Sequence, residues 1–284
     1  MPFKKTTIKT NAKINLGLKV LDTLDDGYHS ICTIMQEIDF YDTIEIKPIK
    51  HKKINLSCYG PIELKADKKN LCYKAAKLIY ENYNCSNGIQ INLKKNIPIG
   101  AGLGGGSSNA AGILKTLNQL FNLKISDADL TDLAMSIGCD TPFFINGGIQ
   151  LCEGKGEILT PLKIDLSQYY ILLVLPNFSI STSWAYSFFK NDLCKTFDSN
   201  KFRSFQHSFD WKLFENDFEK VVNLTYPEID NIRSVLENQK ALLVSLSGSG
   251  STMFGVFDEF LNVDLINHTL NPHNTHIVKP IFKN

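Results

Sequence analysis

The first third of the chain alternates between apolar and polar side chains, which is the period of a half-buried β-strand. The alternation covers residues 13–21, 31–40 and 43–49, and a turn-forming Asp-Asp-Gly sequence at 25–27 separates the first two stretches. This pattern predicts antiparallel β-structure.

Residues 70–83 change to a helical period, with apolar side chains spaced to share one face. The pattern then predicts a strand, two helices and a strand at 89–93, 107–120, 126–138 and 149–151. Between the first of these strands and the next helix lies a turn rich in glycine.

Beyond about Gly156 the pattern begins again. It predicts a strand at 170–175, helices at 182–189 and 218–236, and strands at 242–246, 253–257 and near 276–278. Because strands and helices are mixed without strict βαβ repetition, we expect an α+β fold. A length of 284 residues favours two domains, which we place at 1–156 and 157–284.

The charges nearly balance, with 30 Lys and Arg against 29 Asp and Glu. No global field therefore attracts nucleic acid or an anionic membrane, and we expect neither as a partner. The start of the chain lacks the apolar core of a signal peptide, and the longest apolar run, 169–176, is too short to cross a bilayer. We expect a cytoplasmic protein, as a monomer or homodimer.

Seven cysteines are scattered along the chain without a C-x-x-C pair: Cys32, Cys58, Cys72, Cys85, Cys139, Cys152 and Cys194. They are typical of reduced core thiols. His273 and His276 lie in a polar stretch without a second ligand pair, so a solvated loop is the better interpretation and no metal ligand is assigned.

The glycine-rich segment has five glycines among residues 100–106. Its residues are Pro98, Ile99, Gly100, Ala101, Gly102, Leu103, Gly104, Gly105, Gly106, Ser107 and Ser108. So many glycines are costly in conformational entropy, but they let backbone N–H groups approach phosphate oxygens. The helix that follows offers its positive end to a polyphosphate, and a serine hydroxyl can reach a magnesium ion. Lys94 and Lys95 supply nearby positive charge.

Two other interpretations of this segment remain. One is a tight turn that packs a helix against a sheet. The other is a dinucleotide-binding fingerprint, because Gly100, Gly102 and Gly105 have its spacing, with Asp127 and Asp129 at the distance of a ribose-binding acid. Those acids, however, fall at a helix start rather than after a second parallel strand, and no Walker-type sequence occurs anywhere.

The glycine-rich segment resembles the middle motif of the GHMP kinases, and the two other motifs of that family occur in order at 12–16 and 245–252. We call residues 12–16 the first motif, the glycine-rich segment 98–108 the second motif and residues 245–252 the third motif. The resemblance implies ATP as co-substrate with Mg²⁺, an N-terminal domain with a left-handed βαβ crossover, and a ferredoxin-like C-terminal domain.

Residues 26–29 and 138–144 resemble the corresponding stretches of those family members that phosphorylate a cytidine-diphosphate-linked alcohol in isoprene biosynthesis. The resemblance implies that Asp140 is the catalytic base and that Lys13 keeps its carboxylate ionised. Without the resemblance, Asp140 is a turn former and Lys13 an outward, solvated charge on a strand.

The resemblance also implies a substrate side and an adenine side of the site. On the substrate side, Tyr28, His29 and Tyr186 would hold the cytosine, with Trp184 as an alternative to Tyr186. The other substrate-binding candidates are Asn15, Thr182 and Gly248. On the adenine side we expect Asn70 and Lys95. Two rival functions stay open: a GHMP kinase with another acceptor, and a noncatalytic nucleotide sensor.

Overall fold

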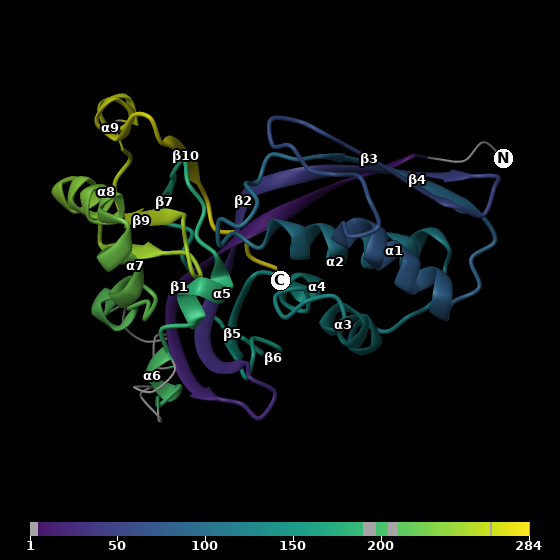
Figure 1. The fold of residues 1–284 in the computed structure, drawn as a ribbon, viewed down its shortest axis with the longest axis horizontal. Coiled ribbons are helices and arrows are strands. Elements are labelled where there is room, and N and C mark those ends of the chain that lie inside the picture. The colour runs from purple at the N-terminus through teal and green to yellow at the C-terminus, as the bar shows by residue number, and fades with distance from the viewer. Residues whose placement is uncertain (1–4, 190–196, 204–209, 262, 284) are drawn as a thin grey trace. The chain divides into compact units, whose positions relative to one another are not determined.

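The computed structural model describes residues 5–189, 197–203, 210–261 and 263–283. Its elements form two units, and two long strands, β1 (Thr6–Thr23) and β2 (His29–Ile49), contribute residues to both (Figure 1). The first unit comprises Met1–Ala12, Phe40–Ile99 and Gly104–Asn146. The second unit comprises Lys13–Asp39, Gly100–Leu103 and Gly147–Asn284.

The sheet of the first unit is built on β4 (Gly88–Lys94). The end of β2 pairs with it antiparallel, with Thr43 opposite Lys94, and β3 (Ile54–Tyr59) pairs with it parallel. Because β3 and β4 are parallel and α1 lies between them in sequence, they form a βαβ crossover.

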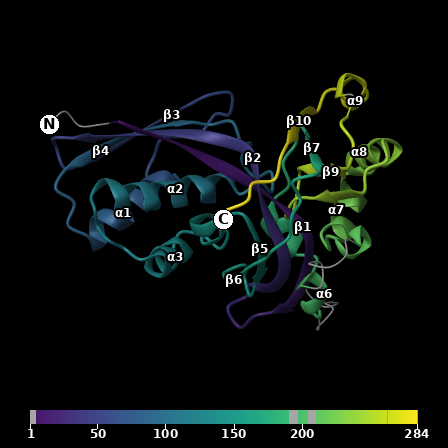
Figure 2. The ribbon, with the colours of Figure 1, turned by 180° about the vertical axis from the view of Figure 1, so that it is seen from behind.

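Four helices of the first unit begin where the sequence supplies caps or a turn: α1 (Leu71–Asn82), α2 (Gly105–Leu120), α3 (Asp127–Met135) and α4 (Phe143–Asn146). Asn70 caps α1 by accepting from Cys72 N, and Ser126 caps α3 by accepting from Asp129 N. In both views α1 and α2 lie side by side along one face of the sheet (Figures 1 and 2).

The second unit contains two groups of strands. In one, the start of β2 pairs with β5 (Ile149–Glu153), which pairs with β6 (Ile158–Pro161). The other is an antiparallel sheet in the order β10-β7-β9-β8, with bounds Asn274–Val278, Tyr170–Leu175, Met253–Phe257 and Leu243–Leu246. The remaining elements are α5 (Thr182–Tyr186), α6 (Asn200–Arg203), η2 (Trp211–Leu213), α7 (Glu219–Thr225), α8 (Pro227–Asn238) and α9 (Val263–Leu270).

The core of the second unit joins its sheet to its helices. Leu172, Val244 and Phe257 of the sheet pack in one cluster with Val222 and Ile232 of α7 and α8. The chain order β7, α7–α8, β8, β9, α9, β10 is the βαββαβ order of a ferredoxin-like domain. The expected two-domain α+β architecture is therefore confirmed.

Some predicted elements differ from the structure. The predicted strands at 31–40 and 43–49 are parts of the single strand β2. The predicted helix at 218–236 is two helices, because Pro227 starts α8 and keeps the preceding Tyr226 out of the helical region. His276 lies in β10, opposite Leu173, which agrees with the strand predicted near 276–278 and not with the interpretation of His276 as a loop residue.

Six of the seven cysteines are free thiols, and Cys194 lies outside the described residues. Burial raises the pKa of the Cys32 thiol to about 12, which fits an unreactive core thiol. Within the described residues, no helix has both the length and the apolar composition to span a bilayer.

Candidate active site

The second motif is shared between the units, since residues 100–103 belong to the second unit and α2 starts in the first. Gly104 precedes α2 in the left-handed conformation, at φ 66°. Gly105 has no room for a side chain, because a Cβ there would lie 2.8 Å from Ile97 Cγ2 and 3.0 Å from Lys95 Nζ. An ammonium group thus lies against the first turn of α2, where the helix already favours an anion.

Asp42 holds the connection from β4 to α2. Its buried carboxylate accepts from Lys95 Nζ at 2.6 Å and from Asn109 Nδ2 at 2.9 Å. The backbone N–H groups of Asn96 and Ile97 donate to its other oxygen at 2.7 and 2.9 Å. Because Asn96 precedes the glycine turn and Asn109 follows it, one carboxylate fixes the chain on both sides.

Asp42 is absent from the sequence-based candidates, although the strand pattern contains a signal for it. It has the same phase as Ile44 and Ile46, so the alternation places a carboxylate on the buried face of β2. A charged residue in the apolar phase of a strand needs a buried partner. Lys95 is that partner.

Both residues predicted for the adenine side have contacts within the first unit. Burial lowers the pKa of the Lys95 ammonium, and the charge of Asp42 partly offsets this effect. The Asn70 side chain caps α1 and donates through Nδ2 to Lys65 O at 3.2 Å. Their contacts with a nucleotide stay predictions.

The third motif packs against the turn of the second motif. Ser247 Oγ donates to Gly102 O at 2.8 Å, and Thr252 N donates to Ala101 O at 3.3 Å. A Cβ on Gly102 would lie 1.9 Å from Ser247 O. Gly102 is therefore required for contact between the two motifs, a reason different from the phosphate approach predicted for it.

Residues of the first motif contact the second and third motifs within the second unit. Lys13 N donates to Leu103 O at 3.0 Å. A Cβ on Gly248 would lie 3.5 Å from both Asn15 Oδ1 and Gly102 Cα. Three sequence motifs more than 80 residues apart along the chain thus meet at one place.

A line of hydrogen bonds orients the Lys13 side chain. Lys13 Nζ donates to Asn15 Oδ1 at 2.6 Å, and Asn15 Nδ2 donates to Thr33 Oγ1 at 2.9 Å. Thr33 Oγ1 in turn donates to Gly17 O at 2.5 Å. Lys13 is only 3% exposed, so its interpretation as a solvated surface charge is wrong. The predicted contact of Asn15 with the substrate stays a prediction.

Asp140 lies in the turn between α3 and α4 and is half-buried. Thr141 N donates to Gly138 O at 2.9 Å, which closes this turn. Within the described part of the chain, the buried Thr141 Oγ1 has no hydrogen-bond partner. Asp140 belongs to the first unit and Lys13 to the second, so their pairing stays a prediction.

The residues predicted to hold cytosine lie in the second unit. Tyr28 is 57% exposed, with Lys155 Nζ 4.9 Å from the centre of its ring. The rings of His29 and Tyr186 stack with centroids 5.2 Å apart at 23°. His29 Nε2 is buried and has no hydrogen-bond partner among the described residues. These rings offer stacking surfaces and an unsatisfied polar atom to a flat base.

Trp184, the alternative to Tyr186, packs elsewhere. Its ring lies edge-on against Phe188 and Tyr226, with centroids 5.0 and 5.6 Å away. The nearby Thr182 hydroxyl lies 3.0 Å from Ser249 Oγ, so the start of α5 contacts the third motif.

Two family models match the chain: the GHMP kinases N terminal domain over residues 70–148 and the GHMP kinases C terminal domain over 200–270. A 4-diphosphocytidyl-2-C-methyl-D-erythritol kinase of Clostridium botulinum strain Hall is 39% identical over 90% of this chain and 92% of its own length. A kinase of the same name from Clostridium beijerinckii is 40% identical over 91% of this chain and 93% of its own.

Solved structures show the same likeness. A crystal structure of 4-(cytidine 5'-diphospho)-2C-methyl-D-erythritol kinase matches with a TM-score of 0.78 at 27% identity, covering 96% of this chain and 99% of that one. Homoserine kinase from Cytophaga hutchinsonii shares the fold, with a TM-score of 0.72 at 17% identity over 97% of this chain and 94% of that one. The chain belongs to the GHMP kinase family.

Proposed function

We propose that this kinase transfers the γ-phosphoryl group of ATP to the 2-hydroxyl of 4-diphosphocytidyl-2-C-methyl-D-erythritol, giving the 2-phosphate and ADP in non-mevalonate isoprenoid precursor synthesis. The observation that supports it most is the likeness to relatives with this name, near 40% identity over nine-tenths of the chain. The family matches at 70–148 and 200–270 support it further.

Asp140 is proposed as the general base that accepts the proton of the attacking hydroxyl. Lys13 is proposed to keep that carboxylate ionised and to stabilise charge on the transferred phosphoryl group. The burial of Lys13 supports this role, because a charge removed from water interacts more strongly with a neighbouring anion. Its hydrogen bond to Asn15 fixes the ammonium in place.

ATP is proposed to bind at the start of α2, where free N–H groups favour phosphate, with Asn70 and Lys95 on its adenine side. The proposed Mg²⁺ fits as an ion that ATP brings with it, since magnesium keeps waters and phosphate ligands readily. Among the described residues, no group of three or more His, Cys, Asp or Glu could hold a metal ion. Ser107 is the better hydroxyl ligand, because it is half-buried whereas Ser108 is buried.

The acceptor is proposed to place its cytosine at Tyr28, His29 and Tyr186. The stacked pair and the unpartnered His29 Nε2 support this placement. Thr182 and Gly248 are proposed to lie at the diphosphate, which the contact of Thr182 with the third motif supports.

A domain boundary at residue 156, a cytoplasmic location and a monomeric or homodimeric state are further proposals. The two family matches, 70–148 and 200–270, fall on either side of residue 156 and support the boundary.

An acceptor panel tests the proposed function. ADP formation from ATP is measured with 4-diphosphocytidyl-methylerythritol beside mevalonate, homoserine and galactose, with ATP alone as the blank. We expect kcat/KM for the cytidine compound to exceed the others at least a hundredfold. Preference for another acceptor would assign a different kinase, and binding of ATP without turnover of any acceptor would assign a sensor.

A further inference from the structure

Residues 215–219 connect β1 to the third motif, and the part of β1 that they contact lies, like them, in the second unit. Leu18 N donates to Glu215 O and Asp217 N donates to Leu18 O, both at 2.9 Å. Val20 N donates to Asp217 Oδ2 at 3.0 Å. The segment therefore runs beside β1, the strand that also contains Lys13.

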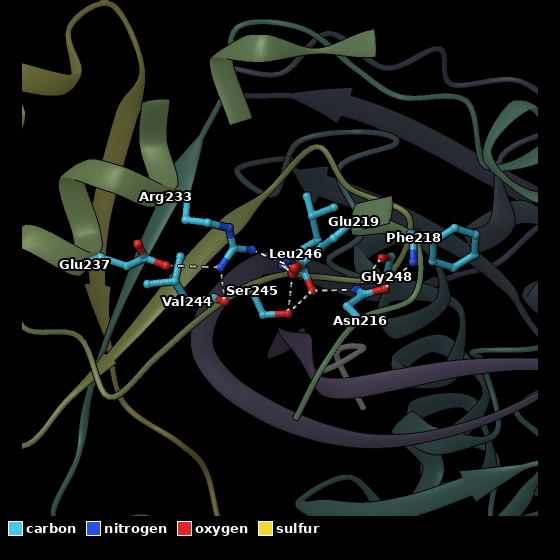
Figure 3. Close-up of polar contacts among 9 residues, drawn as sticks. All are labelled: Asn216, Phe218, Glu219, Arg233, Glu237, Val244, Ser245, Leu246 and Gly248. Atoms are coloured by element: carbon cyan, nitrogen blue, oxygen red, sulfur yellow. Dashed lines mark hydrogen bonds and ion pairs between the residues drawn. The ribbon is translucent and has the colours of Figure 1, made fainter. Parts of the chain in front are cut away.

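Asn216 turns from this segment toward the third motif (Figure 3). It is 2% exposed, and its Nδ2 donates to Leu246 O at 2.9 Å and to Gly248 O at 2.8 Å. Its Oδ1 accepts from Phe218 N at 3.0 Å, ahead of α7. One buried amide thus holds two carbonyl groups of the third motif.

The hydrogen bond to Gly248 O also sets the direction of an N–H group. The Gly248–Ser249 peptide is trans, so the N–H of Ser249 points opposite to the Gly248 carbonyl and away from Asn216. Gly248 has φ 57°, a conformation that favours glycine. Ser249 also contacts Thr182 through its hydroxyl. The direction of this amide depends on a side chain more than 30 residues earlier.

We propose that Asn216 is a positioning residue for the acceptor: it orients the Gly248–Ser249 peptide so that the Ser249 N–H donates to a phosphate oxygen of the cytidine-diphosphate substrate. The inference rests on the proposed function. Phosphate oxygens accept strong hydrogen bonds from backbone N–H groups, and a glycine lets the backbone come close. Asn216 itself touches no substrate.

A neighbouring network holds the strand instead of the turn. Glu219 Oε1 accepts from Leu246 N at 2.9 Å and from Ser245 Oγ at 2.8 Å, and Arg233 pairs with its other oxygen at 2.6 Å (Figure 3). These contacts fix the end of β8. Asn216, by contrast, donates directly to Gly248 O, so its loss should change the geometry of the turn.

Steady-state kinetics of Asn216→Ala, with each substrate varied in turn, test the proposal. Loss of a well-directed hydrogen bond to a phosphate corresponds to about tenfold to a hundredfold in affinity. We expect KM for the acceptor to rise by about this factor and KM for ATP to stay within about threefold. Asn216→Asp should act the same way, because it keeps the acceptor atom for Phe218 N but cannot donate to Leu246 O and Gly248 O.

The matched control is Ile232→Ala, a fully buried core position of α8 whose apolar side chain makes no hydrogen bond to the third motif. It should lower the melting temperature and leave both KM values within about twofold. A folded Asn216→Ala with unchanged acceptor KM, or with equal increases in both KM values, overturns the proposal. If Asn216→Ala does not fold, the same two KM values are measured for Asn216→Asp and have the same meaning. Failure of both variants to fold also overturns the proposal. Failure of the unmodified enzyme to use the cytidine acceptor is a different result, which rejects the proposed function.

Discussion

Each unit has a buried polar side chain that holds the backbone beside one of the motifs, Asp42 in the first and Asn216 in the second, and the two side chains differ in charge. In the first unit Asp42 accepts two backbone N–H groups and the Lys95 ammonium. In the second unit Asn216 donates to two backbone carbonyls. The buried backbone groups therefore determine which type of side chain is required. Backbone N–H groups need a side chain that accepts hydrogen bonds, and carbonyls need one that donates them.

This difference has an energetic consequence. Removing one partner of a buried ion pair leaves an uncompensated charge, at a cost of about 3–5 kcal/mol. Asn216 holds two neutral carbonyls, and each costs about 1–3 kcal/mol when it loses its partner. We therefore expect changes at either residue to lower stability, and changes at Asn216 also to alter binding of the acceptor in the folded protein.

The largest effect should come from changing the proposed general base, Asp140, which belongs to neither turn. Asp140→Asn should lower kcat by about 10²–10⁴-fold, the usual value of positioned proton transfer, with ATP affinity nearly unchanged. Turnover assays and calorimetric titration with ATP measure the two. Asp132→Asn, an exposed position on α3, is the matched control and should keep full activity. Turnover near that of the unmodified enzyme in Asp140→Asn would remove this residue from the mechanism.

The ion pair of the first unit gives the next effect. Asp42→Ala should lower the free energy of unfolding by about 3–5 kcal/mol, because the Lys95 ammonium stays buried without its partner. Denaturant titration measures it. The double variant Asp42→Ala with Lys95→Met should recover part of the loss, since it removes the unpaired charge. A loss below about 1 kcal/mol in the single variant would contradict this role of the Asp42–Lys95 ion pair.

Changing Tyr28, an exposed tyrosine of the second unit, should affect KM for the acceptor and not KM for ATP. Tyr28→Ala should raise KM for the cytidine acceptor about tenfold to a hundredfold, as expected for a base that stacks on the ring, with kcat little changed. Tyr59→Ala is the control, because Tyr59 is a similarly exposed tyrosine in the first unit. An equal increase in KM for ATP, or no increase for the acceptor, would contradict the role of Tyr28.

The smallest effect concerns pH. Burial raises the pKa of the Glu219 carboxyl above its usual value of 4.5, against the opposing charge of Arg233. The folded state thus binds this proton more tightly, so its contribution to stability is present below pH 4.5 and is lost as pH rises through the raised pKa. Melting temperatures from pH 4 to 7 should fall for the unmodified protein relative to Glu219→Gln. Parallel curves would contradict the assignment.

Much of the fold follows from local patterns. The periods of 2 and 3.6 residues predicted β7, β9, α1 and α2 to within a few residues. Strand β3 was not predicted, although Ile54, Leu56 and Cys58 alternate with the polar residues Asn55 and Ser57. The break between α7 and α8 could have been predicted, since Pro227 is visible in the sequence.

The site was predictable where a motif marks it and not where a distant side chain supports it. The three motifs pointed to residues that the second unit brings together, including Lys13 and Gly248. Asp42 and Asn216 hold backbone groups 30 or more residues away, and nothing local to either residue specifies those partners. Only the phase of Asp42 in its strand gave a usable signal.

The most direct test of the account is the position of the new phosphate. The enzyme is incubated with ATP and 4-diphosphocytidyl-2-C-methyl-D-erythritol, and the product is followed by ³¹P and ¹³C NMR. The account predicts one new phosphomonoester on the 2-hydroxyl for each ADP formed, and its loss in Asp140→Asn. A phosphomonoester on another hydroxyl, or ADP formed without a phosphorylated acceptor, would contradict it.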